Sequence, residues 1–400
     1  MTACLLLLAE VVASARHMQC SQDSRSNSNN HTYHGRSHLC SNYIVGYCFN
    51  CTHQLHCLLP RGNSIPRMEP NTDQITMSGK IKTTKRVDRS GLMKALQTVT
   101  KPLGPKISAP KGEYPAGSPQ LDAHDCAKKE CDVEERVVED VYIYHLKLKV
   151  KDPTESSPEK ERPTKQLFYF AGGSWQTPPS KEHWALCAEF AKQLPDTRVS
   201  IVSCPLAPHS PAPVTMPQLL KCYTTLLQEA TTTGQRVVFA GDSSGGEILL
   251  CLTINALAEN KKAHTPVALI EICPSIDLRQ ENPEQQAIEK NDPILRIASS
   301  RKYADTWRGE WENTDPRINP LFADLASLAR ANVKVHGIVG GHDILRPDAL
   351  VLRDKLGDAG VEGEWLDWDK QMHGYPLTFS YGLDNGKEAK DWILELIKKA

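Results

Sequence analysis

The 400-residue chain lacks any run of eighteen apolar residues, so it contains no segment suited to a membrane-spanning helix. It also has little net charge: 47 Lys and Arg against 48 Asp and Glu leave −1. That balance argues against a general electrostatic attraction to nucleic acid or to anionic membranes. Thirteen cysteines are too few for a disulfide scaffold of this length, and an odd number cannot pair fully within one chain. The remaining composition is typical of a globular protein.

The first part of the chain, residues 1–80, shows no lasting helical or strand period, and we predict a disordered leader of unknown role. Residues 3–8 and 13–15 resemble a signal peptide but lack a basic start, so secretion stays open. The Cys- and His-containing stretch 48–57 leaves a zinc-binding module within 20–57 as an alternative, although its spacing matches no standard zinc finger.

The pattern of the chain changes at residue 135. Residues 81–134 are a basic approach to the main domain with one short amphipathic helix. From 135 to 400, apolar strand-like runs, the first of them at 138–150, alternate with amphipathic helices. Such alternation predicts an α/β fold with a mostly parallel sheet that is covered on both faces. The charged stretch 277–331 breaks this rhythm and is interpreted as an insertion over one edge of the sheet.

Five cysteines fall on predicted helices and strands of this core, at 187, 204, 222, 251 and 273. Nothing in the sequence pairs them, so we expect buried thiols. Buried thiols favour a reducing, cytoplasmic location. No pattern in the sequence indicates an oligomeric state.

A nucleophile is indicated by residues 237–250, VVFAGDSSGGEILL, in which Ser243 lies at the centre of a G-x-S-x-G pattern. Four apolar strand formers precede the pattern, and a predicted fifteen-residue amphipathic helix follows it. A serine on such a sharp strand-to-helix turn stands clear of the backbone, and small flanking residues let strand and helix pass. The adjacent Ser244 is a rival, but it lies one position past the turn.

An oxyanion hole is predicted where an earlier apolar strand ends in Gly172 and Gly173. Glycines allow main-chain N–H groups to approach a ligand closely. We expect donors from Gly172, Gly173 and Ser244 to converge on the developing negative charge. The nearby Trp175 either floors an acyl pocket or belongs to the core.

A serine needs a base to take its proton and an acid to orient that base. His373 follows the last predicted strand and Asp343 follows the strand before it, so both fall at the same sheet edge as Ser243. His342 and Asp348 are competitors. His342 adjoins Asp343, and neighbouring side chains on an extended chain point apart, which makes it a poor base here.

Several motifs together resemble the hormone-sensitive-lipase-like branch of the α/β-hydrolases, which includes fungal-type carboxylesterases. They are GDSSGG (241–246), PLAPH (205–209), GGHDIL (340–345) and HGY (373–375). The family's HGGG motif appears as Ala171-Gly172-Gly173-Ser174, so the histidine that usually braces this loop is missing. The resemblance also implies a helical cap built from residues 85–120 and 277–325.

We therefore expect a serine-dependent carboxylic ester hydrolase that acts through an acyl-serine intermediate and needs no cofactor or metal. Its expected partner is a small-molecule ester with a short acyl or acetyl group. The resemblance further suggests a role in fungal secondary metabolism. Two alternatives stay open: a non-catalytic ligand-binding homologue, which Ala171 favours, and an acyltransferase or lactonase that uses the same triad.

Overall fold

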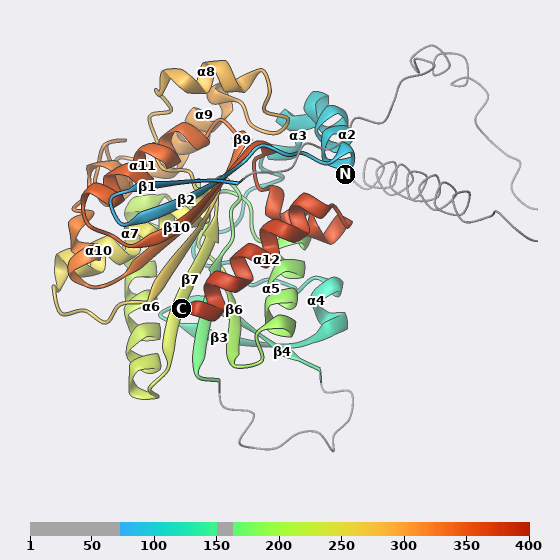
Figure 1. Ribbon diagram of the computed structural model, residues 1–400. Coiled ribbons are helices and arrows are strands. Elements are labelled where there is room, and N and C mark those ends of the chain that lie inside the picture. The colour runs from blue at the N-terminus through green and yellow to red at the C-terminus, as the bar shows by residue number, and fades with distance from the viewer. Residues whose placement is uncertain (1–72, 150–162) are drawn as a thin grey trace, which may run out of the picture. The chain divides into compact units, whose positions relative to one another are not determined.

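The computed structural model describes residues 73–149 and 163–400. Most of the predicted leader and the possible zinc module at 48–57 lie outside these residues. The described part of the chain is built around one ten-stranded sheet with the order β1-β2-β10-β9-β8-β7-β5-β6-β4-β3 (Figure 1). The strands are β1 (Gln74–Ser78), β2 (Ile81–Arg86), β3 (Cys131–Val138), β4 (Val141–Leu148), β5 (Lys165–Phe170), β6 (Thr197–Val202), β7 (Arg236–Asp242), β8 (Ala268–Ile272), β9 (Lys334–His342) and β10 (Gly363–Met372).

The centre of the sheet is parallel, from β6 through β5, β7, β8, β9 and β10 to β2. β5 and β8 are buried at every position, as expected for strands that are covered on both faces. Among the strand pairs that the structure describes, β1–β2, β3–β4 and β4–β6 are the antiparallel ones. The predicted fold class, a mostly parallel α/β sheet flanked by helices, is confirmed.

Helices cover both faces of the sheet. Figure 1 shows α5 and α12 on one side and α6, α7 and α11 on the other. The helices are α2 (Gly91–Thr100), α3 (Gly104–Ser108), α4 (Asp125–Glu130), α5 (Lys181–Gln193), α6 (Ala212–Thr232), α7 (Ser244–Glu259), α8 (Pro283–Glu289), α9 (Ile297–Arg308), α10 (Ala326–Arg330), α11 (Arg346–Asp358) and α12 (Asp384–Lys399). Short 3-10 turns are η1 (Lys101–Leu103), η3 (Pro320–Phe322) and η4 (Tyr375–Tyr381). None of the helices in the described part is long and apolar enough to cross a membrane.

The sheet begins earlier in the chain than predicted. We expected its first strand at 138–150, within a domain that starts at 135. Instead, β1 and β2 form a hairpin whose second strand pairs in parallel with β10. The predicted single strand is the second half of the β3–β4 hairpin. The predicted start of the sheet is therefore wrong, because the β1–β2 hairpin and β3 precede the predicted strand.

The predicted insertion contains α8, α9, η3 and α10. These elements lie in the chain between β8 and β9 and interrupt the alternation of strands and helices. The insertion touches the segment that holds α2 and α3. The Arg296 guanidinium donates to the Lys101 carbonyl at 3.4 Å, and a side chain at Gly104 would collide with the Pro293 carbonyl. The two segments predicted to form a cap thus contact each other.

The seven cysteines in the described residues, at 126, 131, 187, 204, 222, 251 and 273, are all free thiols. This confirms the unpaired state predicted for the five core cysteines. Four of those five are buried, and Cys204 is partly exposed.

Candidate active site

Ser243 lies between β7 and α7 on a strained turn with φ 53° and ψ −122°. A Cβ at Gly241 would come within 2.8 Å of the Gly245 backbone, and one at Gly245 would collide with the Phe170 carbonyl. Both positions therefore require glycine so that strand and helix can pass. The Ser243 N–H donates to the Ile272 carbonyl at 2.9 Å, which anchors the turn to β8. The predicted G-x-S-x-G turn forms because these close contacts leave no room for larger residues.

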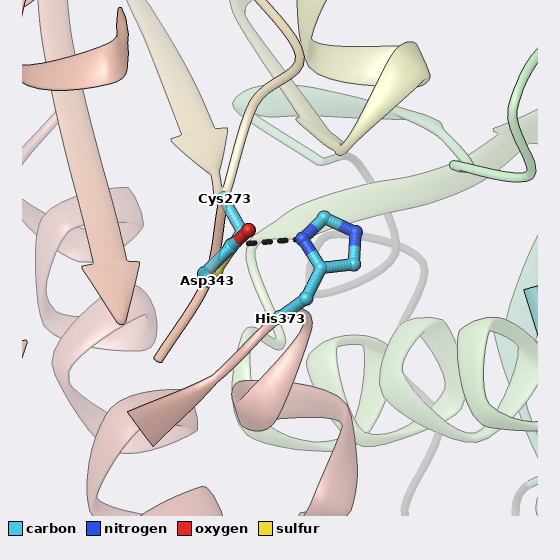
Figure 2. A group of neighbouring side chains, drawn as sticks. All are labelled: Cys273, Asp343 and His373. Atoms are coloured by element: carbon cyan, nitrogen blue, oxygen red, sulfur yellow. Dashed lines mark hydrogen bonds and ion pairs between the residues drawn. The ribbon is translucent and has the colours of Figure 1, made fainter. Parts of the chain in front are cut away.

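The structure brings Ser243, His373 and Asp343 together. The Ser243 hydroxyl lies 3.1 Å from His373 Nε2, and His373 Nδ1 lies 2.8 Å from Asp343 Oδ2. Asp343 directly follows β9, and His373 directly follows β10. Figure 2 shows the Asp343–His373 pair, with the imidazole facing the carboxylate. The three side chains reach one point because parallel strands end at the same sheet edge.

The charge of His373 is set by its surroundings. Burial opposes protonation of the imidazole, but the Asp343 carboxylate outweighs burial and raises the pKa of His373 to about 8. With Nδ1–H donating to Asp343, Nε2 is left as the acceptor for the Ser243 proton. This is the tautomer that a general base for serine requires.

A pH dependence follows from this raised pKa. Only neutral His373 can accept the Ser243 proton, so kcat/KM for a neutral ester should fall about tenfold per pH unit below pH 8. Above about pH 9 it should be constant. Initial rates between pH 5.5 and 9.5, corrected for spontaneous hydrolysis, measure this. A profile that is flat from pH 6 to 9 would contradict the assignment of His373 as the base.

The two competitors lie elsewhere. His342 Nδ1 faces the side-chain oxygen of Gln97 at 3.3 Å. Asp348 accepts hydrogen bonds from Asn282 and Gln285 at 2.8 and 2.9 Å. Among the described residues, neither side chain forms a hydrogen bond with Ser243 or His373.

The predicted oxyanion donors are not all free. The Gly172 N–H donates to Asp242 Oδ1 at 2.9 Å, so it is already used. The Gly173 N–H donates to the Ser244 hydroxyl at 3.1 Å. The backbone N–H groups of Ser174 and Ser244 donate to no atom among the described residues. The expectation for Gly172 is therefore corrected: a carboxylate takes its N–H, and Ser174, which we did not predict, offers one. In the sequence, the signal for Ser174 as a donor is its position directly after Gly172 and Gly173.

The loop lacks the histidine of the HGGG motif, yet Asp242 at the end of β7 holds it in place. The Asp242 carboxylate holds the Gly172 N–H and also accepts from the Tyr169 hydroxyl at 2.8 Å and from His183 Nε2 at 3.1 Å. His183 Nδ1 accepts the Ser180 N–H, which keeps the proton on Nε2. Burial disfavours the charged carboxylate, but His183 and the other donors outweigh burial and lower the pKa of Asp242.

The Ser244 hydroxyl provides a second brace. It accepts the N–H groups of Gly173 and Trp175 at 3.1 and 3.2 Å. From the sequence we predicted Ser244 only as a donor of its own N–H and did not single out His183. Neither bracing role has a local sequence signal, because each depends on residues about 60 to 70 positions away.

Trp175 is packed in the hydrophobic core. Its side chain is buried, its Nε1–H donates to Glu247 at 2.9 Å, and its ring stacks on Trp307 with centroids 6.0 Å apart. These contacts favour the core alternative for Trp175, and its place at an acyl pocket stays a prediction. Through Trp307 on α9, the insertion reaches the chain beside the oxyanion loop.

Glu247 gives a testable effect on stability. Burial raises its pKa to about 8, so the folded protein keeps this proton over a range where the unfolded chain, near 4.5, has lost it. Because the folded state then binds more protons, stability falls as pH rises from about 4.5 to 8. E247Q removes this loss. We expect urea unfolding to show similar free energies at pH 5 and a variant more stable by a few kcal/mol, to order of magnitude, at pH 8.

The matched control for E247Q is E259Q, which changes an exposed carboxyl at the end of the same helix. It should leave the difference in unfolding free energy between pH 5 and pH 8 as in the wild type. An E247Q protein whose free energy of unfolding drops with pH as steeply as the wild type would refute the buried, protonated state of Glu247.

These features define a class of protein: an α/β sheet that presents a serine, a histidine and an aspartate at one edge. Residues 167–377, more than half of the chain, match the family described as alpha/beta hydrolase fold. The chain belongs to this family.

Curated relatives include esterases. The chain is 27% identical over 200 residues to an esterase of Acinetobacter venetianus, covering 50% of this chain and 63% of that protein. It is 26% identical over 226 residues to the esterase LipU of Mycobacterium tuberculosis, covering 54% and 71% respectively. The match thus spans less than two thirds of the Acinetobacter protein. The predicted assignment to the α/β-hydrolases is confirmed.

A solved structure supports the fold. An esterase from the bacterial hormone-sensitive lipase family superposes with a TM-score of 0.62 at 20% sequence identity. The match covers 78% of this chain and 99% of that one.

Proposed function

We propose that this protein is a serine carboxylic ester hydrolase that forms an acyl-serine intermediate. The observation that carries the proposal is the continuous line of hydrogen bonds from Ser243 through His373 to Asp343, at 3.1 and 2.8 Å. Such a line activates a hydroxyl that is otherwise a poor nucleophile. Esterase relatives support the reaction class.

In the proposed reaction, Ser243 Oγ attacks the ester carbonyl while His373 Nε2 takes its proton. Asp343 stabilises the imidazolium that forms. The carbonyl oxygen becomes an oxyanion, and the N–H groups of Ser174 and Ser244 are its proposed donors, joined by Gly173 if its bond to the Ser244 hydroxyl opens. The bond between the carbonyl carbon and the alcohol oxygen then breaks as His373 gives its proton to the leaving alcohol. In the second stage His373 takes a proton from water, the water oxygen attacks the acyl carbon, and the bond to Ser243 Oγ breaks as His373 returns the proton to Ser243.

We further propose that residues 85–120 and 277–325 act as a cap that shapes the substrate pocket. The contact of Arg296 with Lys101 and the stacking of Trp307 on Trp175 support this role. A short acyl group, a fungal-type esterase role in secondary metabolism and a reducing compartment remain part of the proposal. They derive from the sequence resemblance and the buried thiols.

The alternative of a non-catalytic binding homologue rested on the missing histidine at Ala171. Its brace is replaced by Asp242 and Ser244, so the observation that favoured that alternative no longer does so. Acyl transfer or lactone opening would use the same triad and is an outcome of the test.

The test is a series of p-nitrophenyl esters from acetate to octanoate, assayed with the full chain. We expect turnover that is highest for the short acyl groups. Rates that rise steadily toward octanoate would contradict the short-acyl proposal, and absence of turnover on every ester would contradict hydrolysis. Addition of a primary alcohol reports on acyl transfer, because a transferase would form the new ester faster than the free acid.

A further inference from the structure

Cys273 has no role in the proposed reaction, yet it lies beside the triad. It is the first residue after β8, its φ is 47°, and its N–H donates to the Ile338 carbonyl at 2.8 Å. Its side chain is buried, and Figure 2 shows it next to Asp343 and His373. The left-handed backbone and the bond to β9 hold the thiol at this position.

The three side chains present the donor types that zinc prefers. One ligand atom from each of Cys273, Asp343 and His373 lies within 4.8 Å of the others. In the described part of the chain, no other three His, Cys, Asp or Glu side chains come this close. Zinc binds thiolate at about 2.3 Å and imidazole or carboxylate at about 2.0–2.2 Å, which puts the donors of a tetrahedral site roughly 3.3–3.6 Å apart. The widest separation in the cluster must therefore shorten by about 1.2–1.5 Å. The Asp343–His373 pair, at 2.8 Å, must open by roughly 0.5–0.8 Å to admit the ion.

The charge around the cluster favours a cation. Asp343, Asp292 and Asp242 all exert a coulombic attraction on positive charge at His373. Asp343 and Asp292 are fully buried, so solvent screens them little. Of the three ligands only His373 is partly exposed, with 12% of its side chain accessible.

We propose that Cys273, Asp343 and His373 form an inhibitory zinc site that shares its imidazole and carboxylate with the triad. Zinc binds the Cys273 thiolate, an Asp343 oxygen and His373 Nδ1, with water as a fourth ligand. The thiol proton leaves to solvent. The imidazole proton moves from Nδ1 to Nε2, where the ring can no longer accept the Ser243 proton. Hydrolysis stops because the base is lost, while Ser243 itself stays unchanged.

The effect on activity rests on the proposed function, but binding does not. The first experiment titrates the full-length protein, after treatment with a chelator, with zinc during ester hydrolysis. We expect at least a tenfold loss of kcat/KM that is restored by EDTA. In C273S, the zinc concentration for half inhibition, relative to its own zinc-free rate, should rise at least tenfold, because a hydroxyl is a poor zinc ligand.

The matched control is C222S, which removes a buried thiol on α6 away from the triad. It should keep the zinc sensitivity of the wild type. Inhibition of C273S at the same zinc concentration as the wild type would overturn the proposal, because zinc would then act without the thiol.

A second experiment separates the zinc site from catalysis. Cobalt(II) added to S243A, which lacks the nucleophile but keeps all three ligands, should produce a thiolate-to-cobalt charge-transfer band that is absent in S243A/C273S. The difference spectrum cancels any metal taken up by the stretch 48–57. If the band appears but the wild type hydrolyses no ester, the proposed function is contradicted and the metal site is supported. If the band is absent, the metal site is contradicted and the proposed function is unaffected.

Discussion

Replacing Ser243 by alanine is expected to lower kcat for p-nitrophenyl acetate by at least about 10⁴-fold, with KM changed little. The Ser243 hydroxyl oxygen forms the acyl bond, and among the described residues it is the oxygen that lies within hydrogen-bond distance of His373 Nε2. The remaining activity should come from binding and the oxyanion donors alone. Steady-state kinetics on the full chain, with thermal unfolding to show that the variant is folded, measure the effect.

The comparison with S244A makes this prediction specific. Ser244 is the rival nucleophile in the sequence, but its hydroxyl accepts the N–H groups of Gly173 and Trp175 and does not face His373. S244A should therefore still form the acyl-enzyme, at a rate lowered about tenfold because the loop loses one anchor. If S244A were inactive and S243A active, the assignment of the nucleophile would be reversed.

Asp343→Asn is expected to lower kcat by about 10⁴-fold. The amide no longer stabilises the imidazolium, and it can orient the ring with the wrong nitrogen toward Ser243. A second effect distinguishes this from structural damage. Asp343 is the main reason that the pKa of His373 rises to about 8, so the residual activity should have an acid limb shifted toward lower pH. The measurement is the pH profile of kcat/KM for D343N.

The control for D343N is D348N, which changes another buried carboxyl five residues later. Asp348 contacts Asn282 and Gln285, not His373, and burial raises its pKa to about 7. D348N should keep the wild-type acid limb of the pH profile. The same shift in both variants would show that charge in the region at large, not the contact of Asp343 with His373, sets the behaviour of the base.

Much of the central sheet was predictable because each parallel strand is a short apolar run followed by a helix. β5, with the sequence KQLFYF, and β7, with RVVFAGD, are buried at nearly all positions. Such strands have a local signal that needs no knowledge of their partners.

The edge hairpins had no comparable signal. β2, with the sequence IKTTKR, is polar at most positions, and its partner β10 lies about 280 residues further along the chain. The β3–β4 turn is made by Glu139 and Asp140, which both adopt positive φ, at 49° and 59°. Two-residue turns of this kind are normally recognised from Asn-Gly or Asp-Gly, and neither pair is present here.

The site was predictable to the extent that backbone topology determines it. Ser243, Asp343 and His373 each follow a strand, so the direction of the strands places them at one edge. The use of the Gly172 N–H by Asp242 and the burial of Trp175 against Glu247 depend on side-chain packing between segments about 70 residues apart. No short pattern encodes such contacts.

The central claim is that Ser243 is a hydroxyl activated by His373. It is tested most directly by reaction of the full chain with a fluorophosphonate probe, followed by peptide mass spectrometry to locate the modified residue. We predict a single adduct on Ser243, absent in S243A and formed at least about a hundredfold more slowly in H373A. No adduct on Ser243, or equal labelling rates in the wild type and H373A, would contradict the account.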